Sequence, residues 1–161
     1  MESYDIAQIC LNGHVITDRL KRAPDRAQKF CDKCGEPTIS QCQSCNALIR
    51  GYYHIPGSFI ISNTSSAPGY CYECGKPYPW IERKLQAAWE LADELEELSE
   101  EEKQKLKSSL EEVTRDTPKT EVATTKLKKL LSKLGKESYQ LVKQTLVEIA
   151  TEAAKKALFG G

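Results

Sequence analysis

The hydrophobic positions of the chain follow one pattern up to residue 80 and another beyond it. In residues 1–80 the apolar side chains occur in short runs, rich in β-branched and aromatic residues and separated by Gly, Pro and Cys. Runs of this kind predict short strands joined by turns. We expect strands at residues 4–9, 14–17, 38–41 and 47–53. Few large apolar side chains remain to close a core in this half, so another source of stability is needed.

Beyond Trp80 the hydrophobic period becomes 3.6 residues, which predicts helices. The first helix is expected to begin at Pro79 or Trp80. Ser99 and Glu102, three residues apart, are typical of a capping box that opens a second helix. The short connections between the periodic segments predict a bundle of about four helices over residues 81–161.

Two further helices follow from the residues at their ends. Thr117 and Pro118 are typical of an N-cap and a first helical position, and Gly135 is typical of the residue just past a helix end. Together they predict a third helix between residues 117 and 135. A fourth helix carries an apolar stripe with the three- and four-residue spacing of packed helices. Its members are Tyr139, Val142, Leu146, Ile149, Ala153 and Ala157.

Seven cysteines lie in the first half of the chain, and an odd number cannot pair completely into disulfides. The N-terminal residues lack a basic segment followed by an apolar one, so we expect a cytoplasmic protein, in a compartment that keeps thiols reduced. Metal binding explains the cysteines better than disulfides do. With one histidine they form four pairs of potential ligands: Cys10 with His14, Cys31 with Cys34, Cys42 with Cys45, and Cys71 with Cys74.

Eight ligands suffice for two tetrahedral zinc sites with no cysteine left over. The C-x-x-C spacing lets both sulfurs of a pair face one ion, while backbone N–H groups donate to the sulfurs. A redox dithiol is a minor alternative, because no βαβ pattern surrounds any of the pairs. The sequence therefore predicts two structural Zn²⁺ ions as cofactors.

The order of strands and ligand pairs indicates which pairs share an ion. In a zinc ribbon the first pair lies at the turn of a hairpin and the second arrives on a third strand, an order that occurs twice here. We therefore favour Cys10, His14, Cys31 and Cys34 as Zn site 1, and Cys42, Cys45, Cys71 and Cys74 as Zn site 2. A crossed arrangement, which joins the first pair to the third and the second to the fourth, stays open. The predicted fold is α+β, with tandem zinc ribbons at residues 1–80 followed by the helical domain at residues 81–161.

The most distinctive segments are residues 4–14, 30–35, 47–53 and 70–80, which include the sequences YDIAQICLNGH and YCYECGKPYPW. They resemble a bacterial family of small zinc-ribbon proteins that is catalogued as a domain of unknown function. The resemblance extends over the whole chain, including its helical tail. It implies a zinc-ribbon N-terminus and implies no particular activity.

Closed sites with four protein ligands leave no open position for water or substrate, so catalysis by the metal is disfavoured. No nucleotide-binding glycine loop, catalytic triad or carboxylate pair stands out in the sequence. We expect a non-enzymatic zinc-ribbon adaptor that binds another protein, with the helices as a docking or homo-oligomerisation module. No membrane partner is expected, because no apolar stretch approaches the ~20 residues needed to cross a bilayer.

Two alternative functions stay open. One is an RNA- or DNA-binding protein, which would use the ribbon aromatics and the basic stretch at residues 19–33. The whole chain has 23 basic and 23 acidic residues, so it has no general attraction for nucleic acid. The other is a redox- or zinc-responsive regulator, in which oxidation of thiolates or loss of zinc unfolds the ribbons. The aromatic residues that could contribute are Tyr52, Tyr53, Tyr70, Tyr78 and Trp80, and we expect them mainly to cover the ribbon.

Overall fold

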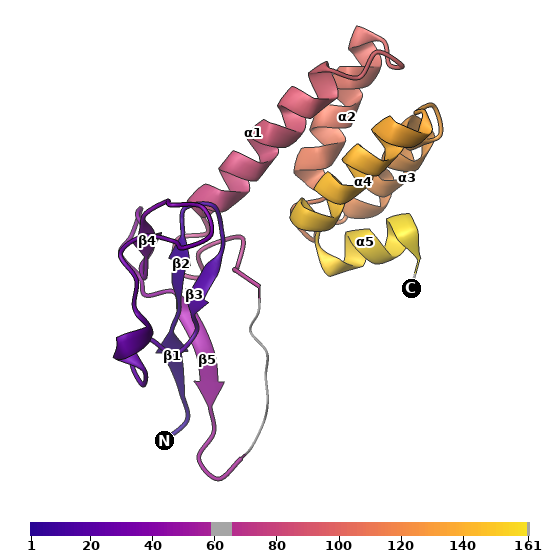
Figure 1. Cartoon of the computed structure of the whole chain (residues 1–161). Helices are drawn as coiled ribbons and strands as arrows, with labels where there is room; N and C mark the ends of the chain where they lie inside the picture. Colours follow the sequence, from indigo (N-terminus) through magenta and orange to yellow (C-terminus); the bar gives the residue numbers. More distant parts are fainter. Residues whose placement is uncertain (59–65, 161) are drawn as a thin grey trace. The chain divides into compact units, whose positions relative to one another are not determined.

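The computed structural model describes residues 1–58 and 66–160 and divides the chain into two compact units, Met1–Glu82 and Arg83–Gly161. The strands are β1 (Ser3–Ile6), β2 (Gln8–Cys10), β3 (Val15–Thr17), β4 (Thr38–Ile39) and β5 (Arg50–His54), and a 3₁₀ turn, η1, occupies Pro24–Arg26. The helices are α1 (Pro79–Asp93), α2 (Glu100–Glu112), α3 (Thr120–Leu131), α4 (Lys136–Ile149) and α5 (Glu152–Phe159). The predicted α+β class, with short antiparallel strands before helices, is confirmed (Figure 1).

The strands of the first unit form two small antiparallel sheets that share one segment of chain. β1 pairs with β5, and β2 lies between β3 and β4. The strand expected at residues 4–9 is therefore divided between the two sheets. The division falls at Ala7, whose N–H donates to the carbonyl of Ile49 at 2.9 Å. β1 and β2 thus join the two small sheets within the first unit.

Among the described residues, the core of the first unit includes two of the candidate ligands. Its members are Ala7, Ile9, Cys42, Ile49, Cys71, Tyr78 and Trp80. The Tyr78 and Trp80 rings stack with their centroids 4.7 Å apart. The indole N–H of Trp80 donates to the carbonyl of Pro68 at 2.8 Å, so the polar atom of this buried ring is satisfied. Two sulfur ligands and the apolar side chains therefore pack in one core.

A buried carboxylate fixes the loop that follows β3. Asp5 lies at an irregularity in β1 and is only 4% exposed. Its Oδ1 atom accepts hydrogen bonds from the N–H groups of Ile6 at 2.7 Å and Lys21 at 2.8 Å. The carbonyl of Asp18 accepts from the N–H of Tyr52 at 2.9 Å. The start of the basic stretch is thus held against both β1 and β5.

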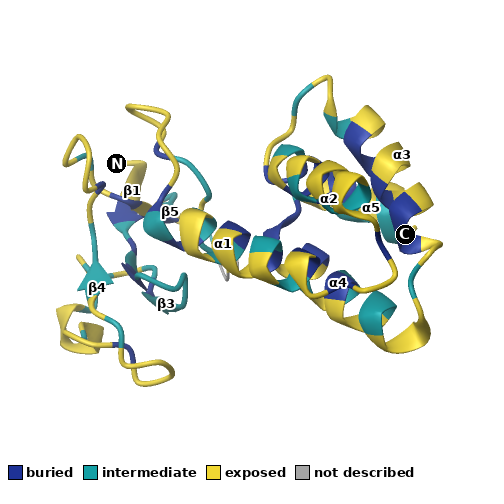
Figure 2. Cartoon of the chain, turned by 90° about the horizontal axis from the view of Figure 1, so that it is seen from above, coloured by how far each residue is buried: buried dark blue, intermediate teal, exposed yellow. Residues whose placement is uncertain are grey.

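Five helices lie between Pro79 and Phe159, one more than the sequence predicts. Within the second unit α2 packs on α3, and α3 packs on α5. The predicted capping box is confirmed, because both of its hydrogen bonds between Ser99 and Glu102 are present. Buried and exposed positions alternate around the helices (Figure 2). Among the described residues, no helix has the length and apolar character required to span a bilayer.

The single helix expected from Tyr139 to Ala157 is wrong, because the chain turns and starts again at Thr151. The Thr151 hydroxyl accepts from the N–H of Ala154 at 3.3 Å and donates to Asp116 Oδ1 at 2.7 Å. The N–H of Thr151 donates to the carbonyl of Val113 at 2.9 Å. These bonds to the end of α2 favour a new N-cap over continuation of α4. Ala154 is consequently buried in place of the expected Ala157.

The predicted ends of the third helix are also wrong. Helix α3 begins at Thr120, two residues after the predicted first position, Pro118. The Thr120 hydroxyl accepts from the N–H of Thr117 at 3.0 Å and donates to the carbonyl of Arg115 at 2.9 Å, which holds the preceding residues in a turn. Gly135 has φ of −67° and is the N-cap of α4, so it does not act as a left-handed residue closing α3.

Candidate metal centres

Eight side chains gather into two groups of four, and each group could hold one metal ion. The groups are Cys10, His14, Cys31 and Cys34, and Cys42, Cys45, Cys71 and Cys74. In each group all four ligand atoms lie within 4.8 Å of one another. The structure therefore brings together every ligand named from the sequence, in the sequential grouping.

The first group is built on the turn between β2 and β3. The N–H of Cys10 donates to the carbonyl of His14 at 3.0 Å, and Gly13 occupies the turn with φ of 90°. This left-handed conformation favours glycine. His14 Nδ1 lies 3.5 Å from Cys10 Sγ and 3.6 Å from Cys31 Sγ, and the sulfurs of Cys10 and Cys34 are 3.7 Å apart. Nδ1 is therefore the ring atom of His14 that faces the centre of the group.

The second group joins two C-x-x-C loops that are far apart in the sequence. The sulfurs of Cys42 and Cys74 are 3.8 Å apart, and those of Cys45 and Cys71 are 3.6 Å apart. These separations exclude disulfides, whose S–S bond is about 2.05 Å. Cys42 and Cys71 are buried, whereas Cys74 is exposed. An ion in this group would be covered by the core on one side and lie close to the surface on the other.

The three C-x-x-C loops share one backbone pattern. In the loop at Cys31, the N–H of Cys31 donates to the carbonyl of Glu36, and the N–H of Gly35 donates back to the carbonyl of Cys31, both at 2.8 Å. Equivalent pairs of bonds close the loops that begin at Cys42 and Cys71. The left-handed position of each loop is taken by Gly35, Asn46 and Gly75, with φ of 76°, 63° and 75°. Glycine adopts this conformation without strain, and asparagine is its usual substitute, as at Asn46.

Comparison with protein families identifies the family of this chain. A family model described as an uncharacterized protein conserved in bacteria (DUF2321) matches residues 3–158. The chain belongs to the DUF2321 family. The match includes both units of the DUF2321 chain and all eight candidate ligands. Comparison with curated proteins and with solved structures finds no match.

Backbone N–H groups of the DUF2321 chain lower the pKa of three thiols, Cys34 in the first group and Cys42 and Cys71 in the second. The N–H of Glu36 holds the pKa of Cys34 at about 6. The N–H of Cys74 likewise holds the pKa of Cys71 at about 6. The N–H of Glu73 also lies 3.4 Å from Cys71 Sγ. Because the thiolate is the form that binds metals, these loops favour metal binding near neutral pH.

Two other thiols of the DUF2321 chain keep their protons more strongly in the absence of metal. Burial raises the pKa of Cys10. The N–H of Ala47 lowers the pKa of Cys45, but desolvation and the nearby sulfurs of Cys71 and Cys74 outweigh it and raise this pKa to about 12. A cation that enters the group displaces such protons, so metal binding is expected to release them.

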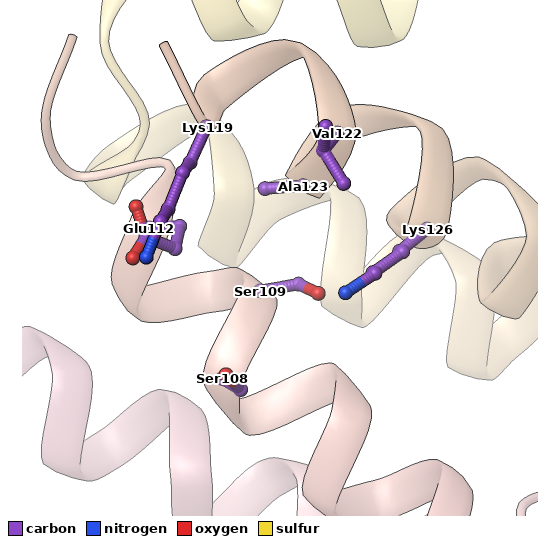
Figure 3. Close-up of a pocket in the computed structure, with 7 residues that line it drawn as sticks. All are labelled: Ser108, Ser109, Glu112, Lys119, Val122, Ala123 and Lys126. Atoms are coloured by element: carbon purple, nitrogen blue, oxygen red, sulfur yellow. The ribbon is translucent and has the colours of Figure 1, made fainter. Parts of the chain in front are cut away.

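A separate hollow of about 300 Å³ lies between α2 and α3 in the second unit of the DUF2321 chain (Figure 3). It is lined by Ser108, Ser109, Glu112, Lys119, Val122, Ala123 and Lys126. The Lys126 amine is directed toward Ser109 (Figure 3). The lining supplies hydroxyls, amines and a carboxylate but neither cysteine nor histidine, so it does not form a third centre of the same chemistry.

Proposed function

We propose that this DUF2321 chain is a non-catalytic adaptor protein, in which two structural zinc ions fix the first unit and that unit presents a surface to another protein. The geometry of the two ligand groups carries the proposal. Zinc is held in structural sites by four cysteines or by three cysteines and one histidine, the donor sets found here. Thiolates also favour zinc over magnesium, calcium and manganese, which prefer oxygen ligands.

The distances between donor atoms fit one zinc ion in each group. A tetrahedron with Zn–S bonds of about 2.3 Å has sulfur–sulfur edges of about 3.8 Å, and a Zn–N bond of about 2.05 Å gives a sulfur–nitrogen edge of about 3.6 Å. Three of the sulfur–sulfur distances are 3.7, 3.8 and 3.6 Å, and two of the sulfur–nitrogen distances are 3.5 and 3.6 Å. All four donor atoms of each group lie within 4.8 Å of one another. A polynuclear cluster would push the four donors farther apart, because its own atoms lie between them.

Zinc would supply stability that the core of the first unit lacks. Structural zinc sites in small domains bind with roughly 10–16 kcal/mol, which is available as folding free energy. Cys42 and Cys71 belong to the hydrophobic core, so an ion that joins them also fixes the apolar side chains around them. The metal would therefore act through the shape that it gives to the surface of the unit.

Four protein donors around each ion leave no open coordination position, which supports a scaffold over a catalyst. The helical unit offers exposed apolar side chains for docking or for self-association. Val122, Leu141 and Val147 are 55%, 50% and 45% exposed. Sedimentation of the full chain with and without Val122→Ser or Leu141→Ser tests this module. A sedimentation coefficient that is independent of concentration and of both substitutions would assign no self-association to it.

Metal analysis of the purified full chain tests the zinc scaffold. We expect two zinc ions per chain, and intense visible bands of tetrahedral cobalt thiolate after exchange with Co²⁺. Cys34→Ser and Cys74→Ser, which change an exposed cysteine of the first and the second group, should each weaken zinc binding at its own site more than at the other. A protein that carries no zinc, or a first unit that stays folded after complete chelation, contradicts the proposal.

The adaptor role needs a second experiment. A partner identified by affinity purification from the native cell should bind the purified zinc-loaded chain in isolation and lose binding on chelation. Enzymatic turnover by the purified chain that disappears with a single polar substitution would replace the adaptor role with a catalytic one.

A further inference from the structure

Two exposed tyrosine rings contact one arginine on the first unit, and a third ring packs on one of them. Tyr4, Tyr53 and Tyr72 are 47%, 38% and 50% exposed. The rings of Tyr4 and Tyr53 lie with centroids 4.7 Å apart. The guanidinium carbon of Arg50 lies 4.6 Å from the centre of the Tyr4 ring and 3.8 Å from that of Tyr72. We name these four residues the Arg50 cluster.

Two structural elements hold the Arg50 cluster in place. Tyr4 and Tyr53 are directly paired across β1 and β5, which lie side by side in Figure 1. Tyr72 stands between the candidate ligands Cys71 and Cys74, in a loop that the bound ion would fix. The loop of the second metal group therefore contributes one residue, Tyr72, to this exposed surface.

The charge of Arg50 is not neutralised within the cluster. In residues 1–58 and 66–160 the contacts of its guanidinium are with the two tyrosine rings, and no carboxylate there forms an ion pair with it. Contact with aromatic rings orients a guanidinium and reduces the entropy lost when it binds, while its N–H groups remain able to donate. Such a group is prepared for a planar anion that accepts two parallel hydrogen bonds.

We propose that the Arg50 cluster binds a carboxylate-bearing, extended peptide segment of a partner protein. Arg50 would take the carboxylate, and the exposed tyrosine rings would pack against the residues beside it. Tyrosine and arginine are the side chains that most often dominate the energy of protein interfaces. This inference rests on the proposed zinc scaffold, since Tyr72 is placed by the second metal group.

Charge selects a peptide over a nucleic acid as the occupant. Residues Met1–Glu82 contain eight basic and eight acidic side chains, which cancel. In the zinc-loaded form, seven thiolates exceed the charge of two Zn²⁺ ions by three, so the unit is net negative. The many phosphates of a nucleic-acid backbone would be repelled by this negative unit, and the Arg50 cluster provides only one cation to bind them. A peptide with one carboxylate and apolar neighbours matches a single cation among three rings.

Selection from a displayed library of random dodecapeptides, with the zinc-loaded full chain immobilised, tests the proposal. We expect the selected peptides to share an aspartate or glutamate next to apolar or aromatic residues. For a synthetic peptide of that sequence, Arg50→Leu and Arg50→Lys should each weaken binding about tenfold or more, because the bond to the charged group or its ring contact is lost. Amidation of the peptide's acidic side chain should weaken binding similarly. Tyr72→Phe, which keeps the ring, should bind normally, and Tyr72→Ala should not.

Arg26→Leu is the matched control, because it removes the same charge from an exposed position of η1 outside the cluster. It should bind the peptide as the parent chain does. Failure to select any peptide, or binding that is indifferent to Arg50, overturns the inference. So does binding of a labelled deoxythymidine 20-mer that is lost in Arg50→Leu and kept in Arg26→Leu, which would assign the cluster to nucleic acid. Zinc content is measured on every variant, so a chain that holds two ions but binds no peptide fails this inference alone, while absent zinc fails the scaffold itself.

Discussion

Replacement of Gly51 by alanine is the sharpest test of how the first unit is packed. Gly51 lies in β5, where the backbone of Asp18 crosses it closely. A Cβ atom at this position would lie 2.1 Å from the Asp18 carbonyl oxygen and 3.0 Å from the N atom of Ala7. Both neighbours are backbone atoms, so no side-chain rotation relieves the overlap.

The cost of Gly51→Ala follows from these contacts. Forcing a methyl group into a filled space costs about 1–3 kcal/mol. Moving the backbone of Asp18 away from β5 also lengthens the 2.9 Å hydrogen bond from the Tyr52 N–H to the Asp18 carbonyl. Loss of such a bond costs about 0.5–1.5 kcal/mol. We expect a total near 3 kcal/mol, which reduces the apparent zinc affinity roughly 100-fold if folding of the unit and metal binding are coupled.

Competition for zinc between the chain and a chromophoric chelator measures this affinity directly. Gly69→Ala is the matched control, because its Cβ would meet only the Ile81 side chain, at an ordinary contact distance of 3.4 Å. It should bind zinc with nearly the affinity of the parent chain. If Gly51→Ala and Gly69→Ala bind zinc equally well, the close crossing of Asp18 over β5 does not stabilise the unit and the reasoning is refuted.

Three further predictions concern single residues. Gly75→Ala places a Cβ at φ of 75°, which costs about 1–2 kcal/mol, so zinc affinity at site 2 should fall about tenfold. Asn46→Gly should bind zinc as tightly as the parent chain. The same chelator competition measures both variants. Ser99→Ala removes the capping box and should lower the free energy of unfolding by about 1 kcal/mol, measured from the helical circular dichroism signal in urea; an unchanged midpoint would show that the box is redundant. The ammonium of Lys133 lowers the pKa of Glu102, so this carboxylate stabilises the folded state above the ordinary value of 4.5 and its contribution is lost as the pH falls below it. The melting temperature of Glu102→Gln should therefore decrease less than that of the parent protein as the pH falls below 4.5. If the two proteins show the same dependence of melting temperature on pH, the ion pair does not cause the decrease.

Features that depend on neighbouring residues could be predicted from the sequence. The spacing of Cys31 and Cys34 allows both sulfurs to face one ion within a single tight turn, without a contribution from distant residues. The capping box is similar, because Ser99 and Glu102 exchange hydrogen bonds across three residues. The strand positions were approximated for the same reason, since alternation and turn residues act locally.

Features that depend on distant residues could not be predicted in this way. The break before α5 requires the Thr151 hydroxyl to bond Asp116, which is 35 residues away. The periodicity of residues 139–157 contains no sign of that partner, so a single helix was the natural expectation. The Arg50 cluster is a further example, because it depends on the pairing of β1 with β5 and on the loop that places Tyr72. The sequence shows these aromatic residues without showing that they are neighbours.

The division of one segment between two sheets changes what the metal ions can be expected to stabilise. β1 and β2 are separated only by Ala7, and the ligand Cys10 ends β2 while Ile9 beside it enters the common core. Cys42 and Cys71, from the other ligand group, pack into that same core. An ion in either group therefore constrains side chains that the other group also needs. Metal binding at either centre would therefore help to fold the whole first unit, including the exposed surface of the Arg50 cluster.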